Sequence, residues 1–188
     1  FSNVATDNYL AGVMAGEYLG SIGHKRVATV TGPRITQWAR DRLDGFRDGL
    51  AKYQAQLEWQ YSQTDLPDFE TGLAACDALM ADYAGRALPT AIWAQNDIIA
   101  AAVLKSLTNQ GYRVPEDISL LGMDDIQLCT MVTPMLSTIH QPLREIAQES
   151  IRIIMENEPG AKPQPRRVFL TPTLQVREST APPNPAAD

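Results

Sequence analysis

The sequence predicts an α/β fold with a doubly wound parallel sheet, and three observations predict it. Apolar segments typical of strands alternate with helical apolar stripes along most of the 188 residues, which favours parallel strands joined by right-handed crossovers with helices on both faces. The hydrophobic fraction of 44% and the charged fraction of 20% are those of a globular protein, so a packed core is expected rather than disorder. Two carboxylates, Asp124 and Asp125, follow a short apolar strand and a glycine, at the strand end where such sheets bind ligands.

The first half of the chain contains patterns for three helices and two strands. In the helical segments apolar residues recur every three or four positions, whereas Leu57, Trp59 and Tyr61 alternate as in a strand. Asp7 can cap the first helix and Gly23 can end it. The expected elements are a helix over 10–22, a strand over 27–31, a helix over 43–53, a strand over 57–61 and a helix over 67–83.

The second half continues the alternation. Asn96 or Asp97 is expected to cap a helix that Gly111 ends. The other expected elements are strands over 90–93, 118–121 and 136–140, a helix over 142–156, and strands near Val168 and Leu174. Residues 156–165 read as a polar link, and the proline-containing end of the chain reads as a disordered tail.

Composition and spacing argue against several classes of function. The net charge of −6, with 16 scattered basic residues, argues against a nucleic-acid surface, which needs clustered Lys and Arg. Cys76 and Cys129 share no metal-ligand spacing with His24 or His140, so no metal and no other cofactor is expected. Two cysteines far apart suit a reducing cytoplasm, and no apolar run is long enough for a membrane span.

The sequence also offers little support for an enzyme. Asp124 and Asp125 are adjacent, so they are badly placed to flank a glycosidic bond from opposite sides. The chain contains no nucleophile elbow, phosphate loop or dinucleotide-binding fingerprint. We therefore expect a binding protein without catalytic residues.

Short motifs follow one another in order from about residue 3 to residue 180. They are Thr6-Asp-Asn8, 19–24, Gly32-Pro33 with 42–46, 89–92 with Asn96-Asp97, 111–119 with 122–125, 134–142, and 177–180. Together they resemble the effector-binding part of lactose-repressor-type (LacI/GalR) transcriptional regulators, which share their fold with periplasmic sugar-binding proteins. The resemblance implies a periplasmic-binding-protein-like type I fold that senses a sugar or related small polar metabolite between two lobes.

The resemblance also implies a domain organisation. Residues 1–6 would end an N-terminal lobe, 7–140 would form the C-terminal effector-binding lobe, 141–165 would be a crossover helix and link of the N-terminal lobe, 166–180 would be the final strands of the C-terminal lobe, and 181–188 the tail. Family members carry a DNA-binding domain and the first half of an N-terminal lobe, and neither precedes Phe1. We therefore expect a homodimer in the cytoplasm that contacts DNA only through a domain not in this chain. Helix 142–156 should expose Ile146 and Ile154 for want of its partner lobe.

Six candidate ligand residues follow from the resemblance: Arg42, Asn96, Asp124, Trp38, Gln141 and Leu66. Planar polar side chains bridge neighbouring sugar hydroxyls, and an aromatic or aliphatic wall covers the ring face. Sugar-responsive relatives often carry an aromatic residue at the position of Leu66, so stacking is expected from Trp38 or from the missing lobe instead.

Four of these candidates also have a simpler structural interpretation. Arg42 could pair with Asp41 or Asp44, Asn96 could only cap a helix, Asp124 could only shape a turn, and Trp38 could be an exposed loop residue. Of the adjacent pair Asp124 and Asp125, only one can face the crevice squarely. A purine or another polar metabolite stays open as the effector. The rival function is a periplasmic sugar-binding protein of a transport system, against which the repressor-like segments 114–119 and 177–180 argue.

Overall fold

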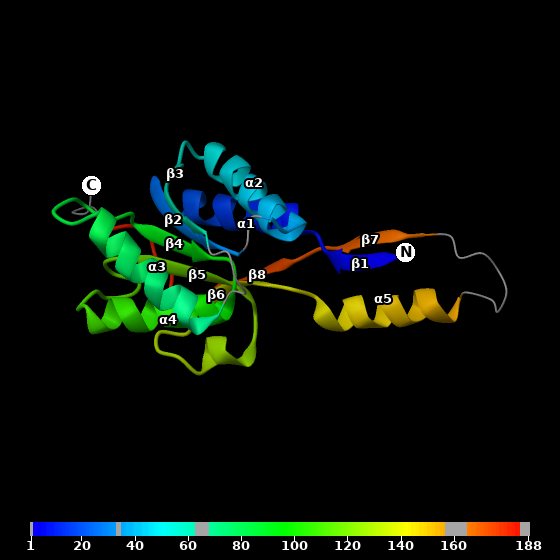
Figure 1. Ribbon diagram of the computed structural model, residues 1–188. Coiled ribbons are helices and arrows are strands. Elements are labelled where there is room, and N and C mark those ends of the chain that lie inside the picture. The colour runs from blue at the N-terminus through cyan, green and yellow to red at the C-terminus, as the bar shows by residue number, and fades with distance from the viewer. Residues whose placement is uncertain (1, 33–34, 63–67, 157–164, 185–188) are drawn as a thin grey trace.

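The main body of the protein is a six-stranded sheet between two layers of helices (Figure 1). The computed structural model describes residues 2–32, 35–62, 68–156 and 165–184. The sheet comprises, in spatial order, β3 (Gln56–Ser62), β2 (Arg26–Thr31), β4 (Ala91–Ala94), β5 (Ser119–Asp124), β6 (Ser137–His140) and β8 (Thr173–Gln175). All neighbouring strands run parallel except β8, which is antiparallel to β6. The predicted parallel sheet is confirmed, with one antiparallel strand at its edge.

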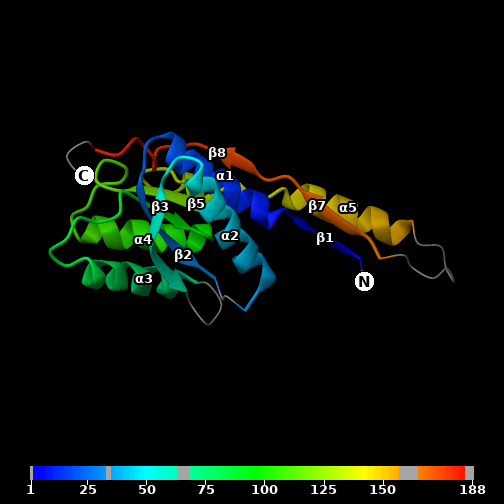
Figure 2. The same ribbon diagram turned by 90° about the horizontal axis from the view of Figure 1, so that it is seen from above.

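Helices cover both faces of this sheet (Figure 2). The helices α1 (Asn8–Ser21) and α2 (Gln37–Ala51) lie on one face, and α3 (Phe69–Asp82) and α4 (Asp97–Asn109) lie on the other. Strand residues alternate between the two cores, so Val27 packs with α1 and α2 whereas Ala28 packs with α3 and α4. Helix α2 begins at Gln37 and not at residue 43. The prediction started too late because the regular apolar stripe begins only at Leu43.

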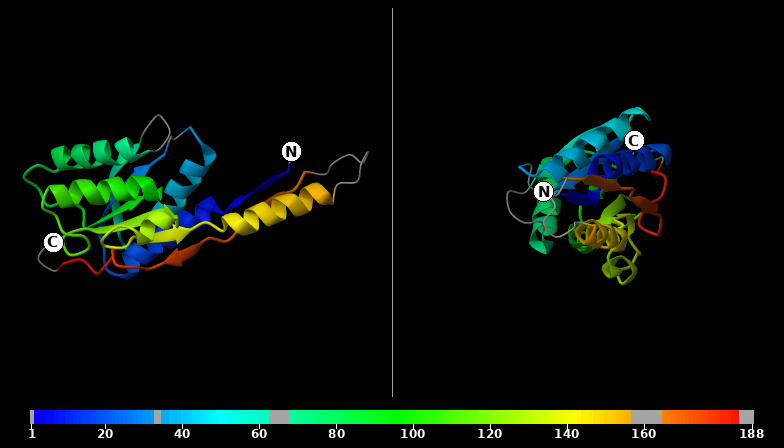
Figure 3. Two further views of the ribbon diagram at one scale, coloured as in Figure 1. Left: turned by 90° about the horizontal axis from the view of Figure 1, so that it is seen from below. Right: turned by 90° about the vertical axis from the view of Figure 1, so that its right-hand side faces the viewer.

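A smaller body extends from the carboxyl ends of the parallel strands (Figures 1 and 3). It consists of β1 (Asn3–Thr6), β7 (Arg167–Leu170) and α5 (Leu143–Met155). We call these three elements the extension. In it β1 and β7 pair in parallel, with Asn3 opposite Arg167, and α5 contacts β1. Three chain segments therefore connect the extension to the main body: between β1 and α1, between β6 and α5, and between β7 and β8.

This arrangement corrects the assignment of residues 166–180 to the final strands of the C-terminal lobe. Only β8 joins the six-stranded sheet, because β7 pairs with β1 in a separate two-stranded sheet. Apolar alternation identifies a strand near Val168, but it does not specify the strand with which it pairs.

Helix α5 carries an exposed apolar face. Ile154 is 68% exposed and Met155 79%, whereas Ile153 is buried. The expected exposure is thus confirmed for Ile154, but Ile146 is only half-exposed because its side chain lines a cleft against the main body. No described helix is long and apolar enough to cross a membrane.

Helices α1 and α2 approach each other at glycines. The glycines at this contact are Gly12, Gly16, Gly45 and Gly49. A methyl group added at Gly12 would lie within 3.0 Å of the Arg42 carbonyl oxygen, and one at Gly45 equally close to the Tyr9 carbonyl oxygen. Both obstacles are backbone, so a side chain at either position requires the helices to separate.

The beginning of the C-terminal segment is anchored to the main body, so Ala181 does not belong to the disordered tail expected over 181–188. The Ala181 carbonyl accepts hydrogen bonds from His24 Nε2 at 3.0 Å and from Ser119 Oγ at 2.9 Å. Since a carbonyl only accepts, His24 carries its proton on Nε2, and its Nδ1 accepts from Thr90 Oγ1 at 2.9 Å. Residues 185–188 lie outside the described residues. The prolines of this segment had predicted a disordered tail. Its first residue is held by His24 and Ser119, which are distant in the sequence.

The first prediction concerns the glycine contact. Gly45→Ala should lower the free energy of unfolding by about 1–3 kcal/mol, because the added methyl group meets backbone that cannot rotate away. Urea unfolding measures this, with Gln148→Ala at an exposed position of α5 as the control, expected within about 0.5 kcal/mol of the parent. Equal stability of Gly45→Ala and the parent would contradict the close contact.

The second prediction concerns pH. Burial lowers the pKa of His24 from 6.5 to about 4, so the unfolded chain binds a proton that the folded chain excludes between these values. The stability contributed by neutral His24 is therefore full above pH 6.5 and falls as the pH drops toward 4, by on the order of 1–3 kcal/mol.

Asp124 acts in the opposite direction, since its raised pKa favours the folded state as the pH falls from 6 toward 3.8. The measurement is therefore the difference between the parent and His24→Gln in urea unfolding from pH 6.5 to 4. The parent should lose more stability than the variant over this range. Parallel curves would show that His24 is not held neutral.

Candidate functional site

A cleft of about 840 Å³ lies between the carboxyl ends of the parallel strands and the extension. The main body contributes Trp38, Arg42, Gln95, Asn96 and Asp124. The extension and its connections contribute Asn3, Gln141, Ile146, Arg167 and Phe169. The cleft therefore has one wall from each body, and five of the six residues predicted from the sequence line it. The sixth, Leu66, lies outside the described residues.

Arg42 is held at the base of the cleft by α1 and by the end of β4. Its Nε donates to Asn8 Oδ1 and its Nη1 donates to the Gln95 carbonyl oxygen, each at 2.8 Å. Burial lowers the pKa of Arg42 to about 10, opposed by Asp124, so the guanidinium stays charged at neutral pH. The alternative of a surface pair with Asp41 or Asp44 does not hold, since Arg42 is 7% exposed and uses these partners instead.

Trp38 lies beside this guanidinium. The Arg42 Cζ atom is 4.9 Å from the centroid of the Trp38 ring, a cation–π distance. A Cβ at Gly32 would meet the Trp38 indole, so the absence of a side chain there admits the ring. Trp38 is half-buried, and it forms part of the cleft wall instead of standing in solvent as an exposed loop residue.

Asn96 caps α4 and also lines the cleft. Its Oδ1 accepts from the backbone N–H groups of Ile98 at 2.7 Å and Ile99 at 3.1 Å. The cap uses the oxygen, so the amide nitrogen is the part of this side chain suited to a ligand. The structural and the ligand-binding interpretations of Asn96 are therefore compatible.

Asp124 ends β5 and faces the cleft next to Gln141. Gln141 Nε2 donates to Asp124 Oδ1 at 2.6 Å, and Gln141 Oε1 accepts from Thr6 Oγ1 at 2.7 Å. Burial raises the pKa of Asp124 from 3.8 to about 6, against the opposing effects of Gln141 and Arg42. At neutral pH the carboxylate is largely ionised and can accept hydrogen bonds from hydroxyl groups.

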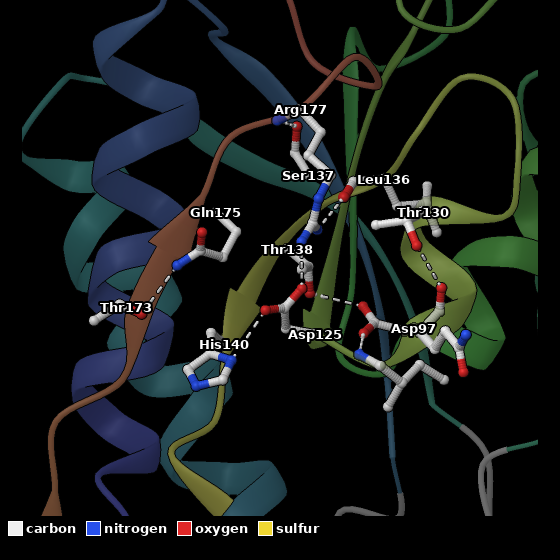
Figure 4. A network of polar contacts seen from close by, with 12 residues as sticks. Asp97, Asp125, Thr130, Leu136, Ser137, Thr138, His140, Thr173, Gln175 and Arg177 are labelled. Carbon is white, nitrogen blue, oxygen red and sulfur yellow. Dashed lines mark hydrogen bonds and ion pairs between the residues drawn. The ribbon is translucent and has the colours of Figure 1, made fainter.

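Asp125 does not line the cleft, and its side chain belongs to a separate polar network (Figure 4). Its carboxylate lies 3.0 Å from His140 Nδ1 and 2.6 Å from Arg177 Nη2. The expectation that only one of the adjacent pair faces the crevice is confirmed, and Asp124 is that residue. Among the described residues, no three His, Cys, Asp or Glu side chains lie together as a metal site.

Several lining residues were not predicted from the sequence. Gln95 is 1% exposed, and neither polar atom of its side chain has a hydrogen-bond partner among the described residues. Phe169, which is 58% exposed, offers an aromatic surface on the extension. Gln95 directly precedes Asn96 at the carboxyl end of a strand, so the rule that ligands bind at these strand ends could also have identified it. Phe169 could not have been identified in this way, because it reaches the cleft only through the pairing of β7 with β1.

The charges in the cleft balance. Among the described lining residues, two are positively charged, Arg42 and Arg167, and two are negatively charged, Asp41 and Asp124. An uncharged ligand with several hydroxyl or amide groups matches this balance better than a strongly charged one.

Comparison with known proteins shows to which family this architecture belongs. Residues 17–180 match the family described as the periplasmic binding protein-like domain. The chain belongs to this family.

Relatives of this periplasmic binding protein-like domain are LacI-type regulators. The chain is 34% identical over 179 residues to the ribose operon repressor of Escherichia coli (strain K12), covering 95% of the chain and 53% of that protein. It therefore spans about half the length of that relative. The resemblance found in the sequence is confirmed.

Solved structures agree with this relationship. A LacI family transcriptional regulator from Enterococcus faecium with bound ribose superposes with a TM-score of 0.83 and 28% identity, over 96% of this chain and 66% of that one. The complex of transcriptional regulator CelR with cellobiose superposes with a TM-score of 0.85 and 29% identity, over 95% and 54%.

The third prediction concerns Gln95 in this domain. Gln95→Met should raise the free energy of unfolding by about 1–3 kcal/mol, because it replaces a buried amide without hydrogen bonds by an apolar side chain of similar length. Gln110→Met is the control, since the Gln110 amide donates to Ser106 Oγ at 3.1 Å and its loss should not stabilise. Destabilisation by Gln95→Met would show that the amide finds partners in solution.

Proposed function

We propose that this chain is the effector-binding part of a LacI-type transcriptional regulator and that its cleft binds a sugar or related small polar metabolite. The observation that carries the proposal is the convergence of Arg42, Asn96, Asp124 and Gln141 on one charge-balanced cleft. These groups present donors and acceptors at close range, and Trp38 and Phe169 offer aromatic surfaces for a sugar ring. Two structural neighbours, which hold ribose and cellobiose, support the same ligand class.

The second candidate, a periplasmic sugar-binding protein for transport, has less support. Its cleft chemistry would be the same, but the relatives that match the chain along 95% of its length are transcriptional regulators. Catalysis also has little support, because Asp125 is turned into its own network and cannot act with Asp124 across a bond.

We further propose how the chain fits into the whole regulator. Ile154 and Met155 on α5 would pack against further elements of the lobe to which the extension belongs, since burying them removes apolar surface from water. The regulator would work in the cytoplasm as a homodimer and bind DNA through a separate domain. Closure of the cleft on an effector would change the relation of the two lobes and hence of the paired DNA-binding domains.

The fourth prediction tests the site. Asp124→Ala should weaken effector binding by at least about tenfold, because hydrogen bonds to a charged acceptor contribute about 1.5–3 kcal/mol each. Isothermal titration calorimetry with ribose, cellobiose and adenine, on the whole regulator and on this chain, measures it. In the whole regulator the variant should also fail to release its operator while binding operator as well as the parent does.

Asp117→Ala is the matched control, because Asp117 pairs with Arg113 on the surface at 2.6 Å, away from the cleft. It should respond to effector like the parent. An Asp124→Ala regulator that releases operator at the same ribose or cellobiose concentration as the parent would overturn the assignment of Asp124.

A further inference from the structure

Asp124 and Asp125 adopt backbone conformations that L side chains rarely adopt. Their φ angles are +123° and +62°. Aspartate tolerates the left-handed region at +62°, but +123° is largely restricted to glycine. Such a conformation persists only where surrounding contacts hold it, so the contacts around these two residues identify what aims Asp124 into the cleft.

The strongest contacts belong to Asp125 and not to Asp124. Asp125 Oδ1 accepts from Arg177 Nη2 at 2.6 Å, and Oδ2 lies 3.0 Å from His140 Nδ1. Arg177 is itself oriented, because its Nη1 donates to the Leu136 carbonyl oxygen at 2.8 Å. The Asp125 and Arg177 side chains are 18% and 19% exposed, so this ion pair is better shielded than a surface pair. We call Asp125, His140 and Arg177 the Asp125 clamp (Figure 4).

The next residue is held as well. The Ile126 N–H donates to Asp97 Oδ2 at 3.0 Å, and Asp97 Oδ1 accepts from Thr138 Oγ1 at 2.7 Å. By contrast, among the described residues the carboxylate of Asp124 accepts a hydrogen bond only from the Gln141 side chain. These contacts hold the backbone immediately after Asp124. The Asp124 side chain itself lines the cleft.

The clamp also lies where two of the three connections to the extension meet the sheet. His140 pairs with Asp124 across β5 and β6 and with Thr173 across β6 and β8. The chain leaves for α5 just after His140, and it returns from β7 just before Thr173. Arg177 lies two residues after the end of β8, so the partners of Asp125 lie in or next to β6 and β8, the two strands to which these connections lead.

We propose that Asp125 is a positioning residue that, through His140 and Arg177, turns the Asp124 carboxylate into the cleft. The proposal rests on the proposed function in so far as Asp124 binds an effector. The test of the positioning role needs no effector. A failure of this proposal can therefore be distinguished from a failure of the proposed function.

The experiment follows the titration of the Asp124 carboxyl carbon by NMR in this chain, in the parent, in Asp125→Ala and in Arg177→Met. In the parent the pKa should be about 6, because the carboxyl is buried. In both variants the released carboxyl should move toward solvent, and its pKa should fall more than halfway toward 3.8. Asp117→Ala, which breaks the exposed pair with Arg113, should leave it unchanged.

The two variants separate positioning from simple charge effects. Loss of the negative Asp125 would by charge alone lower the pKa of Asp124, whereas loss of the positive Arg177 would raise it. Positioning requires a fall in both, and any other result overturns the proposal. If circular dichroism shows Asp125→Ala unfolded, Asp125→Asn replaces it, since the amide keeps an acceptor for Arg177, and a smaller fall in the pKa is expected.

Discussion

The geometry of the cleft depends on the close approach of α1 and α2. Glycines at the crossing leave backbone against backbone, with Gly12 next to the Arg42 carbonyl. At this separation Asn8, in the first turn of α1, reaches the guanidinium of Arg42 in α2 at 2.8 Å. Larger side chains at the crossing would widen the gap and withdraw Asn8 from Arg42. A packing constraint between two helices thereby orients the charged group at the base of the cleft.

Groups that lower stability are concentrated around the same cleft. Asp124 and Arg42 are buried charged groups. Burial raises the pKa of Asp124 and lowers that of Arg42, and both shifts favour the neutral form. Gln95 carries a buried amide without hydrogen bonds, and Asp124 has an unfavourable backbone angle. By contrast, the two hydrophobic clusters that flank the sheet consist of buried apolar side chains, such as Trp93 and Phe46, whose ring centroids are 4.6 Å apart. This contrast is typical of a site arranged for a ligand at some expense of stability.

The cleft is formed by two bodies joined by three short connections. One wall comes from the strand ends of the sheet, and the other comes from β1, β7 and α5. A ligand that contacts both Asp124 and Phe169 bridges the two bodies, so its binding energy bears on their relative position. The Asp125 clamp holds the residue beside Asp124 against β6 and the segment after β8, two strands from which these connections lead, and would link the orientation of the Asp124 carboxylate to the relative position of the two bodies.

The sequence by itself determined the order and type of the main elements, because strand and helix periodicity are local properties of five to fifteen residues. It also indicated Arg42, Asn96, Asp124, Trp38 and Gln141, since parallel strands bring their carboxyl ends to one edge of a sheet and the motifs resembled a known family. Tertiary structure alone decided that β7 pairs with β1, that Ala181 is anchored by His24, and that Gln95 lacks hydrogen bonds. It also showed what holds Asp125 outside the cleft, namely its contacts with His140 and Arg177. Such outcomes depend on hydrogen bonds between residues that are distant in the sequence. Thr6 and Gln141, for example, are 135 positions apart. No local sequence pattern encodes such partners.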